Sequence, residues 1–412
     1  MDFMTELDSR RGSADARAQA VNEESEDVAK IESVSVCTAR VPLDVPTSFA
    51  TRQVLARDYA LVRVRTEDGV EGIGFCYGGS SAGALVAHAV RDLLAPLLIG
   101  QDSLGVERLW EKMYQEALLQ GRAGAVIRAL SILDTAIWDR NARAVRLPLY
   151  QYLGAYRSGT VPAYASGGYY LPGKTPQMLG AELAGYVAMG FKAVKMKVGL
   201  LGEREEEERI RAAREAIGPD ILLMLDANNA WKDLPTAQRF VRRYEPYDPY
   251  WIEEPFSPDD LDNHRRLAQS TPVPVATGEI EAGRWRFKQM LEMEAASILQ
   301  TDAAVCGGIS EFRRIAATAA SYGVKMCPHW FHDLHIHLVA ATPNADFVEF
   351  FPDSQVLNFR RLVDRQLAIK EGGLILHEGP GLGFGFDMEA VKSFALEPWH
   401  RIGAEGAARA RA

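Results

Sequence analysis

Short β-like runs alternate with amphipathic, helix-like segments from about residue 160 to residue 350, and this rhythm limits the possible folds more than any other feature. Eight strands in strict alternation with helices predict a (β/α) barrel, whose strands end at one common mouth. The runs read VPAYASGG, AVKMKVG, ILLMLDAN, YWIEEP, VPVATGE, SILQTDA, KMCPHWF and DFVEFFP.

An ionisable residue stands at or near the end of each run from the second onward. Successive members of this set lie 20 to 29 positions apart, the length of one strand, one helix and their loops. Because a barrel gathers its strand ends at one mouth, we expect these scattered residues to form a single site. They are Lys197, Asp226, Glu253, Glu279, Asp302, His329 and Glu349.

Three carboxylates come from three successive strands: Asp226, Glu253 and Glu279. Each alone could merely cap the helix that follows it. Together at one mouth they would repel one another, and a hard cation with oxygen ligands would relieve that repulsion, which predicts Mg²⁺. Asn228 points the same way as Asp226 and is a candidate for binding substrate. Glu254 is expected to face outward.

Two lysines, Lys195 and Lys197, occupy alternate positions of AVKMKVG and therefore share one face of a strand. On an exposed edge strand that face would simply be solvated. In a barrel it points into the mouth, where each ammonium group is expected to lower the pKa of the other and burial to lower both. A lysine near neutrality can act as a base, while its neighbour stabilises a developing anion.

Asp302 and His329 end strands six and seven, and we expect the carboxylate to fix the tautomer of the imidazole. Glu349, on the last strand, could donate a proton if neighbouring carboxylates raised its pKa. Three more histidines open the next helix and are expected to be packing residues: His332, His335 and His337. Four residues of the loop after the first barrel strand suit a polyol: Tyr164, Tyr169, Tyr170 and Lys174.

The rest of the chain divides around this barrel. Residues 1–30 are predicted to be a solvated tail, and 31–155 a small α+β domain of strand-like runs followed by helical ones. The barrel is assigned to 160–365. A C-terminal segment, 366–400, begins strand-like and could return to the first domain, and 401–412 is predicted to be a second tail.

Composition excludes several classes of function. A net charge of −9 without basic clusters argues against nucleic-acid binding, which depends on neutralising phosphates. No apolar run approaches the roughly 20 residues that span a bilayer. The four cysteines are widely separated and the N-terminus has no apolar core of a signal peptide, so we expect a cytoplasmic protein.

In these motifs the chain resembles the enolase superfamily, specifically its mandelate racemase subgroup, over roughly 31–400. The resemblance rests on Lys-x-Lys in VKMKVG, on LDAN, WIEEP and ATGE for the metal, on QTDAAVCGG with CPHWF, and on VEFF. It implies an N-terminal α+β capping domain over a modified (β/α)₇β barrel, with loops near 45–55 and 77–82 closing over the substrate. It also implies Mg²⁺ and a homo-oligomer.

The expected chemistry is removal of the proton α to a carboxylate. Lys197 and His329 are expected on opposite sides of the α-carbon, and the substrate's configuration decides which takes the proton. We favour an acid-sugar dehydratase, which eliminates water to give a 2-keto-3-deoxy sugar acid. The alternatives are a 2-hydroxyacid racemase or epimerase, a barrel that binds a sugar acid without catalysis, and, ranked last, a cycloisomerase.

Overall fold

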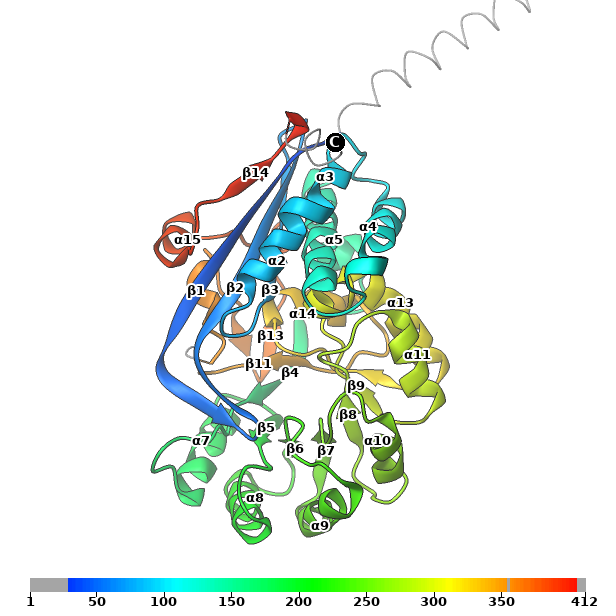
Figure 1. Ribbon diagram of the computed structural model, residues 1–412. Coiled ribbons are helices and arrows are strands. Elements are labelled where there is room, and N and C mark those ends of the chain that lie inside the picture. Colours follow the sequence, from blue (N-terminus) through cyan, green and yellow to red (C-terminus); the bar gives the residue numbers. More distant parts are fainter. Residues whose placement is uncertain (1–28, 354–355, 406–412) are drawn as a thin grey trace, which may run out of the picture.

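The computed structural model describes residues 29–353 and 356–405. Residues 1–28 of the tail predicted at 1–30, and residues 406–412 of the tail predicted at 401–412, therefore lie outside the described residues. Figure 1 shows a domain of long strands and helices, drawn in blue and cyan, above a ring of shorter strands and helices. No helix among the described residues is both long and apolar enough to cross a bilayer.

The ring is the predicted barrel. Its strands pair in parallel and in chain order from β4 to β10, and β11 pairs in parallel with β4. A parallel bridge joins Met326 of the seventh strand, β10, to Ala345, which lies just before β11, so the sheet is closed. The prediction of eight strands is confirmed. They are β4 Thr160–Ser166, β5 Ala193–Lys197, β6 Leu222–Asp226, β7 Pro249–Glu253, β8 Val275–Thr277, β9 Ile298–Leu299, β10 Lys325–Met326 and β11 Val348–Phe350.

Helices link these strands and cover the outside of the ring. Helix α9 shows why such segments are helical: the Asp233 side chain accepts the Thr236 N–H at its start, and the buried Ala237, Phe240 and Tyr244 recur at helical spacing. The barrel helices are α7 Pro176–Ala188, α8 Glu203–Ile217, α9 Leu234–Tyr244 with the 3₁₀ turn η2 Glu245–Tyr247, α10 Leu261–Ala268, α11 Arg284–Glu292, α12 Ala303–Cys306, α13 Gly308–Ser321 and α14 His332–Ala341.

A layer of side chains fills the barrel interior beneath the mouth. Most barrel strands contribute one residue to it: Tyr164, Ala193, Met224, Trp251, Ala276, Ile298 and Cys327. Because strand side chains alternate, the residue two positions later points inward again, one step closer to the mouth. Those next positions hold Lys195, Asp226 and Glu253. The charged residues therefore lie directly above this packed layer, on the side of the barrel mouth.

The N-terminal domain combines a sheet with helices, and a hairpin around Asp68 joins two of its strands. Strands β1 and β2 form a much longer hairpin whose tip, at Phe49 and Arg52, reaches the barrel: Tyr170 donates its N–H to Ser48 O at 3.2 Å. The elements are β1 Ile31–Phe49, β2 Arg52–Thr66, β3 Glu71–Tyr77, α2 Gly83–His88, the π-helical turn η1 Ala89–Leu94, α3 Ala95–Leu98, α4 Val106–Gln120, α5 Ala125–Ala144 and α6 Leu149–Tyr152.

The C-terminal segment touches both domains. The strands β12 Ile369–Lys370 and β13 Gly373–Ile375 follow the 3₁₀ turn η3 Asn358–Leu362, and β13 pairs antiparallel with β4. Helix α15 Met388–Phe394 then leads to β14 His400–Ile402, which pairs antiparallel with β1. Ile402 is buried in that sheet, so ordered structure extends past residue 400, where the tail was expected to begin.

Candidate active site

The charged residues of β5, β6 and β7 lie side by side at the barrel mouth. Parallel pairing places Lys197 beside Asp226, and Asp226 beside Glu253. All three side chains are buried. The register of the strands therefore brings together residues that are 27 to 29 positions apart in the sequence.

Each lysine is paired with carboxylates. Lys197 Nζ donates to Asp226 Oδ2. Lys195 Nζ lies 2.7 Å from Glu253 Oε1 and 2.8 Å from Glu349 Oε1, so it bridges two strands across the mouth. These contacts hold both ammonium groups at the end of β5 in fixed positions.

The expected lowering of the lysine pKa values is wrong for this structure. Burial acts to lower the pKa of Lys197, but the Asp226 carboxylate outweighs it and raises the pKa. The pKa of Lys195 is raised well above its ordinary value because Glu253 and Glu349 outweigh the same effect of burial. The sequence argument counted one neighbouring lysine and missed the carboxylates that the other strands place closer.

The three candidate metal ligands have the chemistry that Mg²⁺ requires. Burial and then the negative charge of Asp226 raise the pKa of Glu253 to about 6, and burial and then Glu254 raise the pKa of Glu279 well above its ordinary value. Within the described residues these side chains do not converge into a preformed metal site, and lysines engage Asp226 and Glu253. Hard oxygen donors in mutual repulsion fit a divalent cation, which would relieve that repulsion.

Glu254 does not face outward as predicted. Its side chain is 2 % exposed and lines the same cavity as Glu279. The backbone turns into the left-handed region there, with φ 44°, so the strand alternation stops at Glu253 and two successive carboxylates face the mouth. Burial, followed by the charges of Asp226 and Glu253, raises the pKa of Glu254 to about 8.

Asp302 and His329 are brought together as expected, with 3.1 Å between Asp302 Oδ2 and His329 Nδ1. The other ring nitrogen lies 3.4 Å from Glu279 Oε1. Burial opposes a charge on the imidazole, but Glu279 and Asp302 prevail and raise the pKa of His329 to about 9. Asp302 also accepts the Ala304 N–H at 2.8 Å, so the carboxylate that orients the imidazole also caps α12.

Glu349 does not meet the condition set for a proton donor. Burial raises its pKa, but Lys195 and His329 outweigh burial and lower the pKa to about 2. Its other oxygen accepts the Trp330 N–H at 2.8 Å. Glu349 is therefore ionised and acts as a fixed partner of Lys195.

The helix histidines are buried, in keeping with a packing role. His335 Nε2 lies 3.0 Å from the Ala303 N–H and supports the start of α12. His337 Nε2 lies 3.1 Å from the carbonyl oxygen of Leu382, which ties α14 to the C-terminal segment.

Only one of the loop residues expected to suit a polyol lines the cavity, namely Tyr169. Tyr164 fills the barrel interior. Tyr170 donates to Glu206, and Lys174 forms an ion pair with Glu182. Neither of these two side chains lines the cavity.

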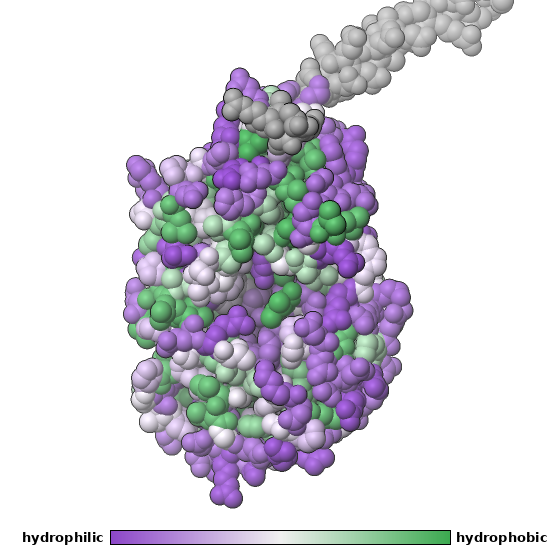
Figure 2. Space-filling view, viewed as in Figure 1, coloured by the Kyte–Doolittle hydropathy of each residue, from purple (hydrophilic) through white to green (hydrophobic). Residues whose placement is uncertain are grey.

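A cavity of about 410 Å³ lies between the barrel mouth and the capping domain, within the range typical of small-molecule sites. Figure 2 shows the surface hollowed near the middle of this view, between the two domains. Both expected closing segments contribute, the first as the β1–β2 hairpin tip and the second as the turn after Tyr77. Asn228 lines the cavity, and its side-chain oxygen has no hydrogen-bond partner among the described residues.

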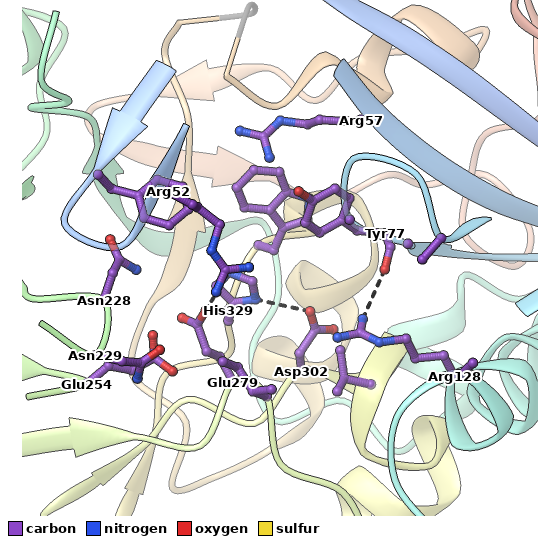
Figure 3. A pocket seen from close by; sticks show the side chains of 18 of the residues that line it. Arg52, Arg57, Tyr77, Arg128, Asn228, Asn229, Glu254, Glu279, Asp302 and His329 are labelled. Carbon is purple, nitrogen blue, oxygen red and sulfur yellow. Dashed lines mark hydrogen bonds and ion pairs between the residues drawn. The ribbon is translucent and has the colours of Figure 1, made fainter. Parts of the chain in front are cut away.

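Three arginines of the capping domain also line this cavity, and sequence reasoning missed them: Arg52, Arg57 and Arg128 (Figure 3). Strand β2, which carries two of them, and helix α5, which carries the third, contain no motif, and only the docking of one domain on the other brings them to the barrel. One signal was available for Arg57. It falls within an apolar, strand-like run, where a buried charge needs an explanation.

Comparison with known proteins identifies the family. Residues 31–154 match the mandelate racemase/muconate lactonizing enzyme N-terminal domain, and residues 178–391 match the enolase C-terminal domain-like family. L-talarate/galactarate dehydratase of Salmonella typhimurium is 34% identical over 368 residues, which is 88% of this chain and 90% of that protein. Arabinonate dehydratase of Saccharolobus solfataricus is 36% identical over 330 residues, 78% of this chain and 86% of that protein.

Solved structures agree with these matches. The Salmonella typhimurium dehydratase, crystallised with Mg and L-lyxarohydroxamate, superimposes with a TM-score of 0.84 at 30% identity, covering 91% of this chain and 95% of that one. A racemase from Streptomyces coelicolor with bound magnesium has a TM-score of 0.84 at 30% identity, covering 89% of this chain and 100% of that one. The chain belongs to the mandelate racemase/muconate lactonizing enzyme family of the enolase superfamily, as its strand-end residues implied.

Proposed function

We propose that this protein is a Mg²⁺-dependent acid-sugar dehydratase, a hydro-lyase. The observation that carries the proposal is that Lys197 of β5 and His329, which follows β10, line one cavity together with Asn228 and Glu279. Base, acid and polar contacts for a hydroxylated carboxylate are thus available at one place. The similarity to two sugar-acid dehydratases supports the choice of reaction.

Lys197 removes the proton α to the substrate carboxylate, for a substrate whose α-proton faces β5. To act as a base it must first lose the ion pair with Asp226 that raises its pKa. Lys195 donates hydrogen bonds to the carboxylate oxygen on which negative charge develops, while Glu349 holds Lys195 in place at 2.8 Å. His329, oriented by Asp302, protonates the β-hydroxyl group. The β-carbon–oxygen bond breaks, water leaves, and the resulting enol tautomerises to a 2-keto-3-deoxy acid.

Asp226, Glu253 and Glu279 would hold the Mg²⁺ ion. When bound, Mg²⁺ supplies a Lewis acid for the substrate carboxylate, which lowers the cost of removing a weakly acidic α-proton. Two carboxylates would then have to exchange their lysine partners for the ion. Asn228 is proposed to donate to or accept from a substrate hydroxyl through its unpartnered side chain.

Two isomerase reactions are alternatives at the same site. A racemase or epimerase would use Lys197 and His329 on opposite faces of the α-carbon, without elimination. Cycloisomerisation, which the sequence analysis ranked last, gains support from D-galactarolactone cycloisomerase of Agrobacterium fabrum, 34% identical over 382 residues. A non-catalytic barrel would not explain why a base, an acid and several carboxylates occur together at one mouth.

Incubation with a panel of aldonic and aldaric acids and Mg²⁺ tests the proposal. A dehydratase forms a 2-keto acid from at least one of them, detected as its semicarbazone. Exchange of the α-proton in heavy water with no keto acid from any acid would instead indicate a racemase or epimerase. Conversion of a sugar-acid lactone without loss of water would indicate a cycloisomerase.

We also propose a cytoplasmic location and a homo-oligomeric state. The four cysteines are buried and unpaired, which supports a reducing compartment. The oligomeric state rests on the family resemblance, and size-exclusion chromatography with light scattering measures it directly.

A further inference from the structure

Arg57 is a buried cation that forms no ion pair with any carboxylate in the part of the chain that the structure describes. Its side chain is 2 % exposed, and Nε makes no hydrogen bond within the described residues. The guanidinium lies over two aromatic rings, with its central carbon 5.3 Å from the ring centre of Tyr77 and 4.5 Å from that of Trp330. The rings fix the position of the charge without neutralising it.

The other buried arginines are satisfied differently. Arg140 pairs with Asp68, and Arg209 pairs with Glu206 at 2.7 Å. This is the ordinary arrangement, because an unpaired charge removed from water is costly. Arg57 departs from this arrangement at the wall of the cavity, where a ligand could supply the missing anion.

Two more capping-domain arginines line this cavity, and neither forms an ion pair with a carboxylate of the described chain. Arg128 of α5 donates to the carbonyl oxygen of Tyr77 at 3.0 Å, so Tyr77 holds both Arg57 and Arg128. Arg52 is exposed at the tip of the β1–β2 hairpin. In Figure 3, Tyr77 and Arg128 lie on the opposite side of the view from Asn228, Asn229 and Glu254.

We infer that Arg57 and Arg128 bind a second carboxylate of the substrate, which makes the preferred substrate an aldaric diacid. This inference rests on the proposed function, in which the first carboxylate lies among the lysines and acidic residues of the barrel mouth. A guanidinium group matches a carboxylate in two parallel hydrogen bonds. The hydroxymethyl end of an aldonic acid would leave both charges unpaired, and this difference sets the specificity.

The test compares a six-carbon aldaric acid with the aldonic acid of the same configuration, in the presence of Mg²⁺. Wild-type protein is expected to have a higher kcat/KM for the diacid. Arg57→Met and Arg128→Met, which keep side-chain bulk and lose charge, are each expected to lower that value by about 10- to 100-fold and to change the value for the monoacid little. Arg63→Met, on the same strand but paired with Glu71 outside the cavity, is the control.

Binding is measured separately from turnover by calorimetry in a Lys197→Met background. Diacid binding that weakens with Arg57→Met or Arg128→Met supports the inference, even if neither acid is dehydrated and the proposed function fails. Equal kcat/KM for the two acids, or equal losses for both in the arginine variants, overturns the inference and leaves the dehydratase in place. If Arg57→Met does not fold, Arg128→Met, at a half-buried site, decides alone.

Discussion

Replacing Asp302 by asparagine is expected to separate proton removal from water loss. The variant keeps a side-chain oxygen to cap α12 through the Ala304 N–H, so the fold is expected to persist. It removes the negative charge that faces His329 Nδ1 at 3.1 Å. For a substrate whose α-proton faces Lys197, proton removal should continue while protonation of the leaving hydroxyl fails.

The size of the effect follows from that contact. A hydrogen bond to a charged group contributes about 1.5 to 3 kcal/mol net. Unit charges about 3 Å apart interact by about 5 kcal/mol at an effective dielectric of about 20, which is an upper bound. Since about 1.36 kcal/mol corresponds to a tenfold change in rate, the dehydration rate should fall by roughly 10-fold at least and by about 10⁴-fold at most.

Two assays on one substrate measure the two steps. Keto-acid formation reports dehydration, and α-deuterium incorporation in heavy water, followed by NMR, reports proton removal. Asp387→Asn is the control, since Asp387 caps α15 in the same manner, far from the cavity. Equal loss of exchange and dehydration in Asp302→Asn would refute the division of labour between Lys197 and His329.

Three further outcomes are expected. Chelation by EDTA should abolish turnover, and added Mg²⁺ should restore it. Glu279→Gln should raise the Kd for Mg²⁺ measured by calorimetry. Full activity after chelation would contradict the ligand assignment. Burial raises the pKa of Asp134 from 3.8 to about 7, so the unfolded chain loses this proton at a lower pH than the folded chain does. The free energy of unfolding should therefore fall as pH rises from about 4 to 7. Asp134→Asn should remove that part of the slope in denaturant titrations, and an unchanged slope would show that other groups cause it. Gly381→Ala should cost about 1–3 kcal/mol of stability, because φ is +66° and the new Cβ would lie 2.1 Å from Asp139 Oδ1. Gly403→Ala, with no such contact, is the control and should melt like wild type. Equal melting temperatures for the two variants would count against this packing.

The sequence predicted the barrel because its signal is local. Every strand carries its own apolar run, and the spacing of the ionisable residues repeats with the strand–helix unit. The predictions that failed depended on geometry that a single strand does not encode. Glu254 was misplaced because strand alternation was extended into a backbone turn at φ 44°. The pKa of Lys195 was misjudged because Glu253 and Glu349 come from other strands.

The arginines of the cavity show a second limit. Arg57 and Arg128 meet the barrel only through the packing of two domains, and no periodic pattern within either domain encodes that contact. The buried guanidinium of Arg57 could have been suspected from its strand-like surroundings. The proposed role of Arg57 in binding a ligand could not have been predicted from the sequence. The ring of Trp330, which helps to hold the guanidinium group, comes from a distant part of the chain.

The pairing of β14 with β1 has a consequence for biosynthesis. About 350 residues separate the end of β1 from the start of β14, which corresponds to roughly 20 to 70 s of translation at 5–20 residues per second. During that time part of one edge of β1 has no partner strand in the nascent chain, and an open edge invites pairing with other chains. Ribosome-bound truncations that stop before His400 should therefore recruit chaperones or aggregate, and release of the full chain should close the sheet.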